Sequence, residues 1–110
     1  MQPIQNLDPT AVKQLLAQNS AVLVDVREPG EYAREHIAGA KLMPLSQLNA
    51  ETLPREQPLV LCCASGMRSQ TAARRLLQAG FTVVAHLHGG LAAWKAAGLP
   101  TQAGFASQPV

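Results

Sequence analysis

The 110-residue chain has the length of a single domain, and its composition of 47% hydrophobic and 15% charged residues is typical of a globular protein, not a disordered one. The formal charge is only +2, and the nine Lys and Arg residues are scattered among few aromatic residues. These features argue against a nucleic-acid-binding surface, and the apolar runs are too short for membrane insertion.

The N-terminus lacks the charged and then apolar pattern of a signal peptide, so we expect a cytoplasmic protein. The two cysteines, Cys62 and Cys63, are adjacent in the sequence. Adjacent cysteines suit neither a routine structural disulfide nor the C-x-x-C spacing of zinc and thioredoxin-like sites. Any special thiol chemistry is therefore expected at one of the two.

Helices and strands are expected to alternate in the first half of the chain. Asp8 followed by Pro9 predicts the start of a helix over Thr10–Asn19. A nearly continuous apolar run then predicts a buried strand over Ala21–Val26. The elements expected next are a short helix, a short strand and one helical turn, over Pro29–Glu35, Lys41–Met43 and Ser46–Asn49.

The second half continues the alternation. The expected elements are a buried strand, a helix that stops at Gly80, another strand and a last helix, over Pro58–Cys62, Ser69–Ala79, Val83–Leu87 and Leu91–Ala97. This order predicts an α/β fold with a mainly parallel central sheet of about five strands and helices on both faces. We expect one domain over residues 1–102 and a flexible tail over residues 103–110, loose coil beginning after Pro100.

Cys63 comes directly after a predicted strand, where ligands bind in parallel α/β sheets. The small residues of Ala64–Met67, which include Gly66, let the backbone curl and direct several N–H groups at one point. These donors, the dipole of the next helix and Arg68 would favour thiolate over thiol, so Cys63 is predicted to be nucleophilic without a histidine base. Cys62 belongs to the apolar strand and is expected to be inert.

Four motifs resemble those of the rhodanese family, and together they cover nearly the whole chain. Cys63–Ser69 is similar to the C-x-x-G-x-R-S loop of single-domain rhodaneses. The other three are similar to the D-x-R-x-x-x-E-[YF], H-I-x-G-A and G-G-x-x-x-W-x-x-A-G-x-P signatures, and they occupy Asp25–Tyr32, His36–Ala40 and Gly89–Pro100. The four motifs occur in the family's order, which makes the combination specific.

The resemblance implies a rhodanese-like fold and a thiosulfate:cyanide sulfurtransferase-like enzyme. Cys63 would take a sulfur atom from a donor such as thiosulfate, hold it as a persulfide and pass it to cyanide, a thiol or a protein. The backbone N–H groups of the loop would hold the persulfide anion, and Arg68 would face the negative charge. The loop residues are Ala64, Ser65, Gly66, Met67, Arg68 and Ser69. The resemblance implies no cofactor.

The chain departs from the family pattern at two places. Glu35 stands where the family often has glycine, and Ala64 with Ser65 replace charged residues of some thiosulfate-specific loops. The second departure weakens the case for thiosulfate as the physiological donor.

Three other functions compete with this one. A cysteine phosphatase also places Cys and Arg at the ends of an anion-binding loop, but it needs C-x5-R, and Cys63 and Arg68 give C-x4-R. A non-catalytic binding or regulatory module with a rhodanese fold is disfavoured because Cys63 is present in an intact loop. A dedicated persulfide carrier that serves one protein partner stays open.

The remaining polar candidates have structural interpretations. Asp25 and Arg27, with Glu31, are expected to form an ion-pair network that supports the loop, with an acid–base group as the alternative. His36 is expected to be a hydrogen-bonded turn residue. His86 and His88 could share one side of a strand, but two histidines without a third ligand make an incomplete site, so we expect no metal.

Overall fold

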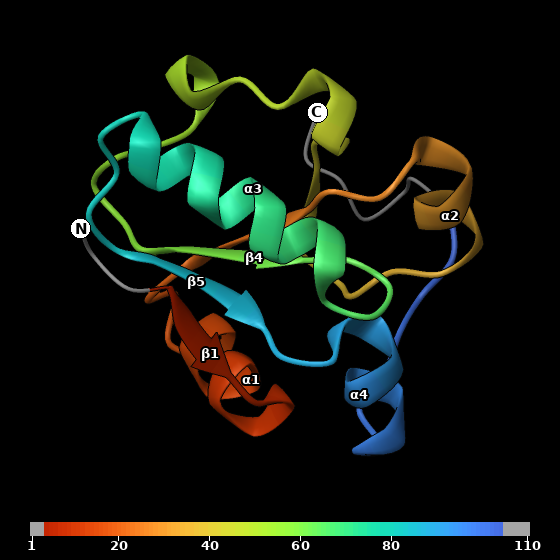
Figure 1. Ribbon diagram of the computed structural model, residues 1–110. Helices are drawn as coiled ribbons and strands as arrows, with labels where there is room; N and C mark the ends of the chain where they lie inside the picture. The colour runs from red at the N-terminus through yellow and green to blue at the C-terminus, as the bar shows by residue number, and fades with distance from the viewer. Residues whose placement is uncertain (1–3, 105–110) are drawn as a thin grey trace.

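The computed structural model describes residues 4–104 and confirms the alternating α/β fold (Figure 1). The strands are β1 (Gln5–Leu7), β2 (Val22–Asp25), β3 (Lys41–Leu42), β4 (Leu59–Cys62) and β5 (Val84–Leu87). The helices are α1 (Pro9–Ala17), α2 (Pro29–Arg34), α3 (Met67–Gln78) and α4 (Gly90–Ala96), with 3-10 turns η1 (Leu45–Gln47) and η2 (Ala50–Thr52). Within the described residues the five strands form one sheet in the order β1-β5-β4-β2-β3, and all neighbouring pairs are parallel.

Helices cover both faces of this sheet. In Figure 1, α3 lies above the sheet, and α1 and α4 lie below it. The apolar core is divided in the same way, with Val12 of α1 and Trp94 of α4 packed on one face and Ala72 and Leu76 of α3 packed on the other. The predicted two-faced arrangement is therefore confirmed.

Because side chains alternate along a strand, the adjacent cysteines belong to opposite faces. Cys62 packs with the α1 and α4 side of the core, and Cys63 packs with the α3 side. The register between β2 and β4 pairs Asp25 with Cys62, so the polar end of β2 lies beside the strand that leads into the Cys63 loop. The buried strand β4 thus places Cys63 close to the N-terminus of α3.

Local signals account for where the first and third helices begin. The carboxylate of Asp8 accepts a hydrogen bond from the N–H of Ala11 at 2.8 Å, which caps α1 as predicted. Helix α3 begins at Met67, two residues before the predicted start. Gly66 adopts a left-handed conformation with φ of +110° and turns the chain directly into the helix, so the loop is shorter than expected.

Two parts of the fold differ from the sequence predictions. Strand β1 was not predicted, because it is only three residues long and mostly exposed and therefore has no buried apolar run. The chain after Pro100 is not loose coil within the described residues: Gln102 exchanges two backbone hydrogen bonds with His36, each 2.8 Å, and Gly104 N–H donates to Ala33. The rest of the predicted tail, residues 105–110, lies outside the described residues.

None of the helices described here, between residues 4 and 104, combines the length and the apolar character needed to cross a membrane.

Candidate active site

Cys63 lies at the carboxyl end of β4, in the loop that joins β4 to α3 (Figure 1). The residue is buried, with 1% of its surface exposed. Its sulfur accepts hydrogen bonds from the backbone N–H groups of Gly66 at 3.0 Å and Ser69 at 3.3 Å. Both donors belong to the start of α3, where backbone N–H groups have no partner inside the helix. The loop thus surrounds the sulfur with groups that stabilise negative charge.

The other loop residues contribute in different ways. Ser69 is fully buried, whereas Ser65 is exposed and Ala64 and Arg68 are intermediate. Met67 is 77% exposed and is the first residue of α3.

The N-terminus of α4 holds the loop from the other side. The N–H groups of Leu91 and Ala92 donate to the carbonyl oxygens of Cys63 and Ala64 at 2.8 and 3.1 Å. Gly90 makes this contact possible, because a Cβ atom there would lie 2.5 Å from the Cys63 carbonyl oxygen, and its φ is +63°. The sequence indicates only that Gly89 and Gly90 form part of a turn, and the close approach of Gly90 to the Cys63 loop becomes visible in the structure.

The two cysteines have opposite electrostatic environments. For Cys63, burial raises the pKa, but hydrogen bonds from the Ser69 N–H and hydroxyl and from the Gly66 and Ser65 N–H groups outweigh it, so the net pKa is lowered. For Cys62, burial together with the nearby carboxylate of Asp25 raises the pKa well above its ordinary value. Of the two cysteines, only Cys63 has surroundings that favour the thiolate over the thiol.

Arg68 is engaged by an acidic partner. Its guanidinium donates to both carboxylate oxygens of Glu31, at 2.8 and 3.0 Å, which joins the first turn of α3 to α2. The hydrogen bonds with Arg68 lower the pKa of Glu31 to about 2. Arg68 was expected to face the anion in the loop, and it does interact electrostatically with Cys63. In this structure, however, both of its terminal nitrogens donate hydrogen bonds to Glu31.

The expected network of Asp25, Arg27 and Glu31 is divided. Asp25 and Arg27 form a buried ion pair with a shortest N–O distance of 2.9 Å, and Arg27 also donates to the backbone carbonyl oxygen of Glu35 at 2.6 Å. Glu31 is bound to Arg68 instead. Asp25 and Arg27 therefore hold the end of β2 against the chain that follows α2.

Several motif residues are structural. The Nδ1 atom of His36 lies 2.8 Å from the Tyr32 carbonyl oxygen, and the two rings stack with their centroids 3.8 Å apart. Trp94 is in the core and donates to the Pro100 carbonyl oxygen. Glu35, the departure from the family pattern, forms an ion pair with Lys95 and accepts from Thr101.

A polar contact behind the loop was not predicted from the sequence. Ser69 Oγ lies 3.1 Å from Nδ1 of His86, and Nε2 of His86 lies 2.6 Å from Oδ1 of Asn6. His86 is only 4% exposed, and the register between β1 and β5 pairs it with Asn6. The available signal was a histidine within an otherwise apolar strand, but its partner Asn6 lies on the strand that was not predicted.

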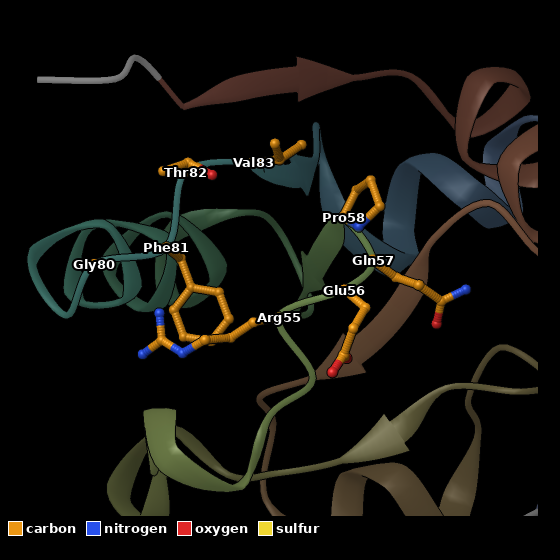
Figure 2. Close-up of a pocket in the computed structure, with 8 residues that line it drawn as sticks. All are labelled: Arg55, Glu56, Gln57, Pro58, Gly80, Phe81, Thr82 and Val83. Carbon is orange, nitrogen blue, oxygen red and sulfur yellow. The ribbon is translucent and has the colours of Figure 1, made fainter.

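A separate hollow lies at the opposite end of the sheet (Figure 2). Pro58 and Val83, which precede β4 and β5, line it, and the guanidinium of Arg55 packs over the ring of Phe81 at 4.2 Å. Because Cys63 follows β4, the Cys63 loop lies at the carboxyl ends of the strands, at the other end of the sheet. This hollow is not part of the cysteine site.

Comparison with known proteins agrees with this geometry. The family model of the rhodanese-like domain matches residues 8–97. The chain is 48% identical over 95 residues to the uncharacterized protein slr1261 of Synechocystis, a match that covers 84% of this chain and 53% of slr1261. The chain therefore spans about half the length of that relative.

Two further proteins match over most of their length. The chain is 35% identical over 86 residues to the thiosulfate sulfurtransferase GlpE of Pseudoalteromonas translucida, covering 76% of this chain and 82% of GlpE. The crystal structure of a rhodanese-related protein from Thermoplasma volcanium superimposes with a TM-score of 0.82 at 27% identity, covering 89% of this chain and 97% of that one.

Proposed function

The chain belongs to the rhodanese-like domain family, a family with members named sulfurtransferase, and we propose that Cys63 is its sulfur-carrying residue. The Cys63 thiolate attacks the outer sulfur of a donor and forms a new S–S bond. The donor's own S–S bond breaks, and its electron pair leaves with the remainder of the donor, which is sulfite when the donor is thiosulfate. The bound sulfur then stays on Cys63 as a persulfide.

The second half of the reaction returns the enzyme to its starting state. A nucleophilic acceptor, which is cyanide, a thiol or a protein, attacks the outer sulfur of the persulfide. The S–S bond to Cys63 breaks, and the cysteine sulfur leaves with the electron pair. No cofactor is needed, because the sulfur is passed directly from one nucleophile to the next.

The hydrogen bonds from Gly66 and Ser69 to the Cys63 sulfur carry this proposal. A persulfide extends the anion by one atom beyond that sulfur, so the loop of residues 64–69 and the N-terminus of α3 are suited to hold it. Asp25 and Arg27 would support the site indirectly, because their buried ion pair fixes the end of β2 beside Cys62.

Thiosulfate is the first donor to test, because GlpE is named a thiosulfate sulfurtransferase. The uncharged side chains of Ala64 and Ser65 leave room for other sulfane donors, such as small persulfides. We also propose the cytoplasm as the location, since this compartment keeps cysteines such as Cys62 and Cys63 reduced.

A survey of sulfur donors by intact-protein mass spectrometry tests the proposal. Wild-type protein and the Cys62→Ser variant are expected to gain one sulfur atom from thiosulfate or a small persulfide, and to lose it on addition of cyanide or a thiol. Cys63→Ser is expected to gain none, because Cys62 is buried and its raised pKa keeps it a thiol. Equal sulfur loading of folded wild type and Cys63→Ser would contradict the assignment.

A further inference from the structure

A line of hydrogen bonds leads from the reactive sulfur to the edge of the sheet. Cys63 Sγ lies 3.6 Å from Ser69 Oγ, which lies 3.1 Å from His86 Nδ1, and His86 Nε2 lies 2.6 Å from Asn6 Oδ1. The four residues come from the end of β4, from α3, from β5 and from β1. Ser69 is 0% and His86 is 4% exposed, so bulk water does not compete for the Cys63–Ser69 and Ser69–His86 contacts, whereas Asn6 lies on the exposed strand β1.

The far end of this line fixes where the protons lie. The amide oxygen of Asn6 can only accept, so Nε2 of His86 carries a proton. In a neutral imidazole Nδ1 is then bare, and it accepts from the hydroxyl of Ser69. The carbonyl oxygen of Gly66, also 3.1 Å from Ser69 Oγ, is the other acceptor open to that hydroxyl.

The near end of the line has the matching polarity. A Ser69 hydroxyl that donates to His86 presents a lone pair to the Cys63 thiol, which donates to it. If the thiol proton moves to Ser69 while the Ser69 proton moves to His86, the Cys63–Ser69 and Ser69–His86 contacts reverse their direction and are kept, and Nε2–H of His86 still donates to Asn6. Nδ1–H then donates to Ser69, and Ser69 donates to the Cys63 thiolate.

We propose that Ser69, His86 and Asn6 form a proton relay that removes the proton from Cys63 before sulfur uptake and returns it after sulfur release. The relay rests on the function proposed above, because it serves the nucleophilic cycle of Cys63. Ser69 touches the reacting sulfur, and His86 and Asn6 act through Ser69.

The relay balances both halves of the reaction. In the first half the S–H bond of Cys63 breaks and an N–H bond forms at Nδ1 of His86, while the cysteine sulfur gains its bond to the donor's outer sulfur. In the second half the S–S bond breaks, the Cys63 sulfur keeps the electron pair, and the proton returns from His86 through Ser69. The enzyme thus ends each cycle in the protonation state in which it began.

The surrounding groups keep the imidazole of His86 neutral in the resting enzyme. Burial, together with the neighbouring imidazole of His88, lowers the pKa of His86, so its Nδ1 atom keeps a lone pair for the Ser69 hydroxyl; the two ring centroids lie 6.5 Å apart. Near the sulfur, Cys62 and Arg68 interact electrostatically with Cys63. Burial keeps Cys62 a thiol, and the charge of Arg68 is paired with Glu31, so His86 is the group positioned to exchange a proton with Cys63.

Titration of the Cys63 thiolate by absorbance, in a Cys62→Ser background, tests the relay. Ser69→Ala and His86→Asn are each expected to raise the pKa of Cys63 by about half a unit or more. Ser69→Ala removes the hydroxyl that donates to the thiolate, and His86→Asn removes the imidazolium that forms when the thiol proton is transferred. The double variant is expected to raise the pKa of Cys63 by no more than the larger of the two single variants does, since both substitutions act through one chain of contacts.

A matched control separates the relay from a structural role. Thr71→Ala removes another α3 hydroxyl that donates to a backbone carbonyl. This control should leave the pKa of Cys63 close to that of the parent. Asparagine at position 86 can still hydrogen-bond to Ser69 but cannot titrate, so an unchanged Cys63 pKa in folded His86→Asn would overturn the relay.

A second measurement leaves His86 itself unaltered. Nitrogen NMR of labelled imidazoles should show the Nε2–H tautomer for neutral His86. Its pKa should be higher in the Cys62→Ser variant than in the variant that also carries Cys63→Ser, because a thiolate stabilises the imidazolium. Identical titration in the two proteins, or an Nδ1–H tautomer, would refute the relay.

Neither measurement uses a sulfur donor, so the relay and the proposed function can fail separately. If Cys63 takes up sulfur but is not coupled to His86, the relay is wrong and the function stands. If the coupling is found but no donor loads Cys63, the proposed function falls, and with it the relay's place in the reaction.

Discussion

Arg68 and Glu31, 37 residues apart in the sequence, form a two-pronged ion pair at the mouth of the Cys63 loop. The pair ties the start of α3 to α2 and neutralises the arginine of the loop motif. Under the proposed function, we expect an anionic donor to meet a cation that is already paired, so Glu31 should limit how strongly Arg68 attracts the donor.

Glu31→Gln is expected to improve the use of anionic donors. Removing the carboxylate charge frees the Arg68 guanidinium, so KM for thiosulfate should fall by up to about fivefold, the range of a partly exposed ion pair. Steady-state kinetics with thiosulfate provide the measurement. In an Arg68→Ala background the same substitution should have no effect, and a KM that falls equally in both backgrounds would show that Arg68 is not involved.

The same pair makes part of the stability dependent on pH. The pKa of Glu31 is lowered to about 2, so its contribution is fully present above the unfolded value near 4.5 and is lost as the pH falls towards 2. Urea unfolding should find wild type more stable than Glu31→Gln by up to ~1 kcal/mol at neutral pH. The difference should shrink steadily below pH of about 4.5, and a pH-independent difference would contradict the ion-pair explanation.

Gly90→Ala should destabilise the protein by about 2–5 kcal/mol, because it combines a strained positive φ with a Cβ atom pressed into the Cys63 carbonyl. Gly98→Ala is the matched control, since Gly98 also has a positive φ, of +77°, but a Cβ atom there would meet nothing within 4 Å beyond its own chain neighbours. Gly98→Ala should therefore be destabilised only by the strain of the positive φ, which costs about 1–2 kcal/mol of stability. Denaturant unfolding compares the two, and equal losses would mean that the α4 contact with the loop is not tight.

We expect no useful hydrolysis of a generic phosphate monoester. The loop closes on a single sulfur atom with C-x4-R spacing, one residue shorter than a cysteine phosphatase needs, and Arg68 is bound to Glu31. An assay with a chromogenic phosphate ester checks this. Robust turnover that disappears in Cys63→Ser would overturn the sulfurtransferase assignment in favour of a phosphatase.

The sequence was sufficient to predict the order of the main strands and helices and the position of Cys63, because buried strands, capping residues and the loop motif are local signals. Contacts between elements were harder. The partner of Arg68 depends on how α2 packs beside α3, and the Asn6–His86 contact depends on β1, a strand too short and too exposed to predict. Both sets of contacts link residues far apart in the sequence, where residue spacing carries no information.

The most direct test of the loop as an anion-binding site is the absorbance titration of the Cys63 thiolate in the Cys62→Ser variant, in which one cysteine reports. Burial raises the pKa of Cys63, but hydrogen bonds from Ser69 and Gly66 outweigh it, so the thiolate should form below the free-thiol value of about 8.5. Because Glu31 pairs with Arg68, Arg68→Ala should raise that pKa only slightly. Titration of folded protein at or above about 8.5 would contradict the proposed mechanism.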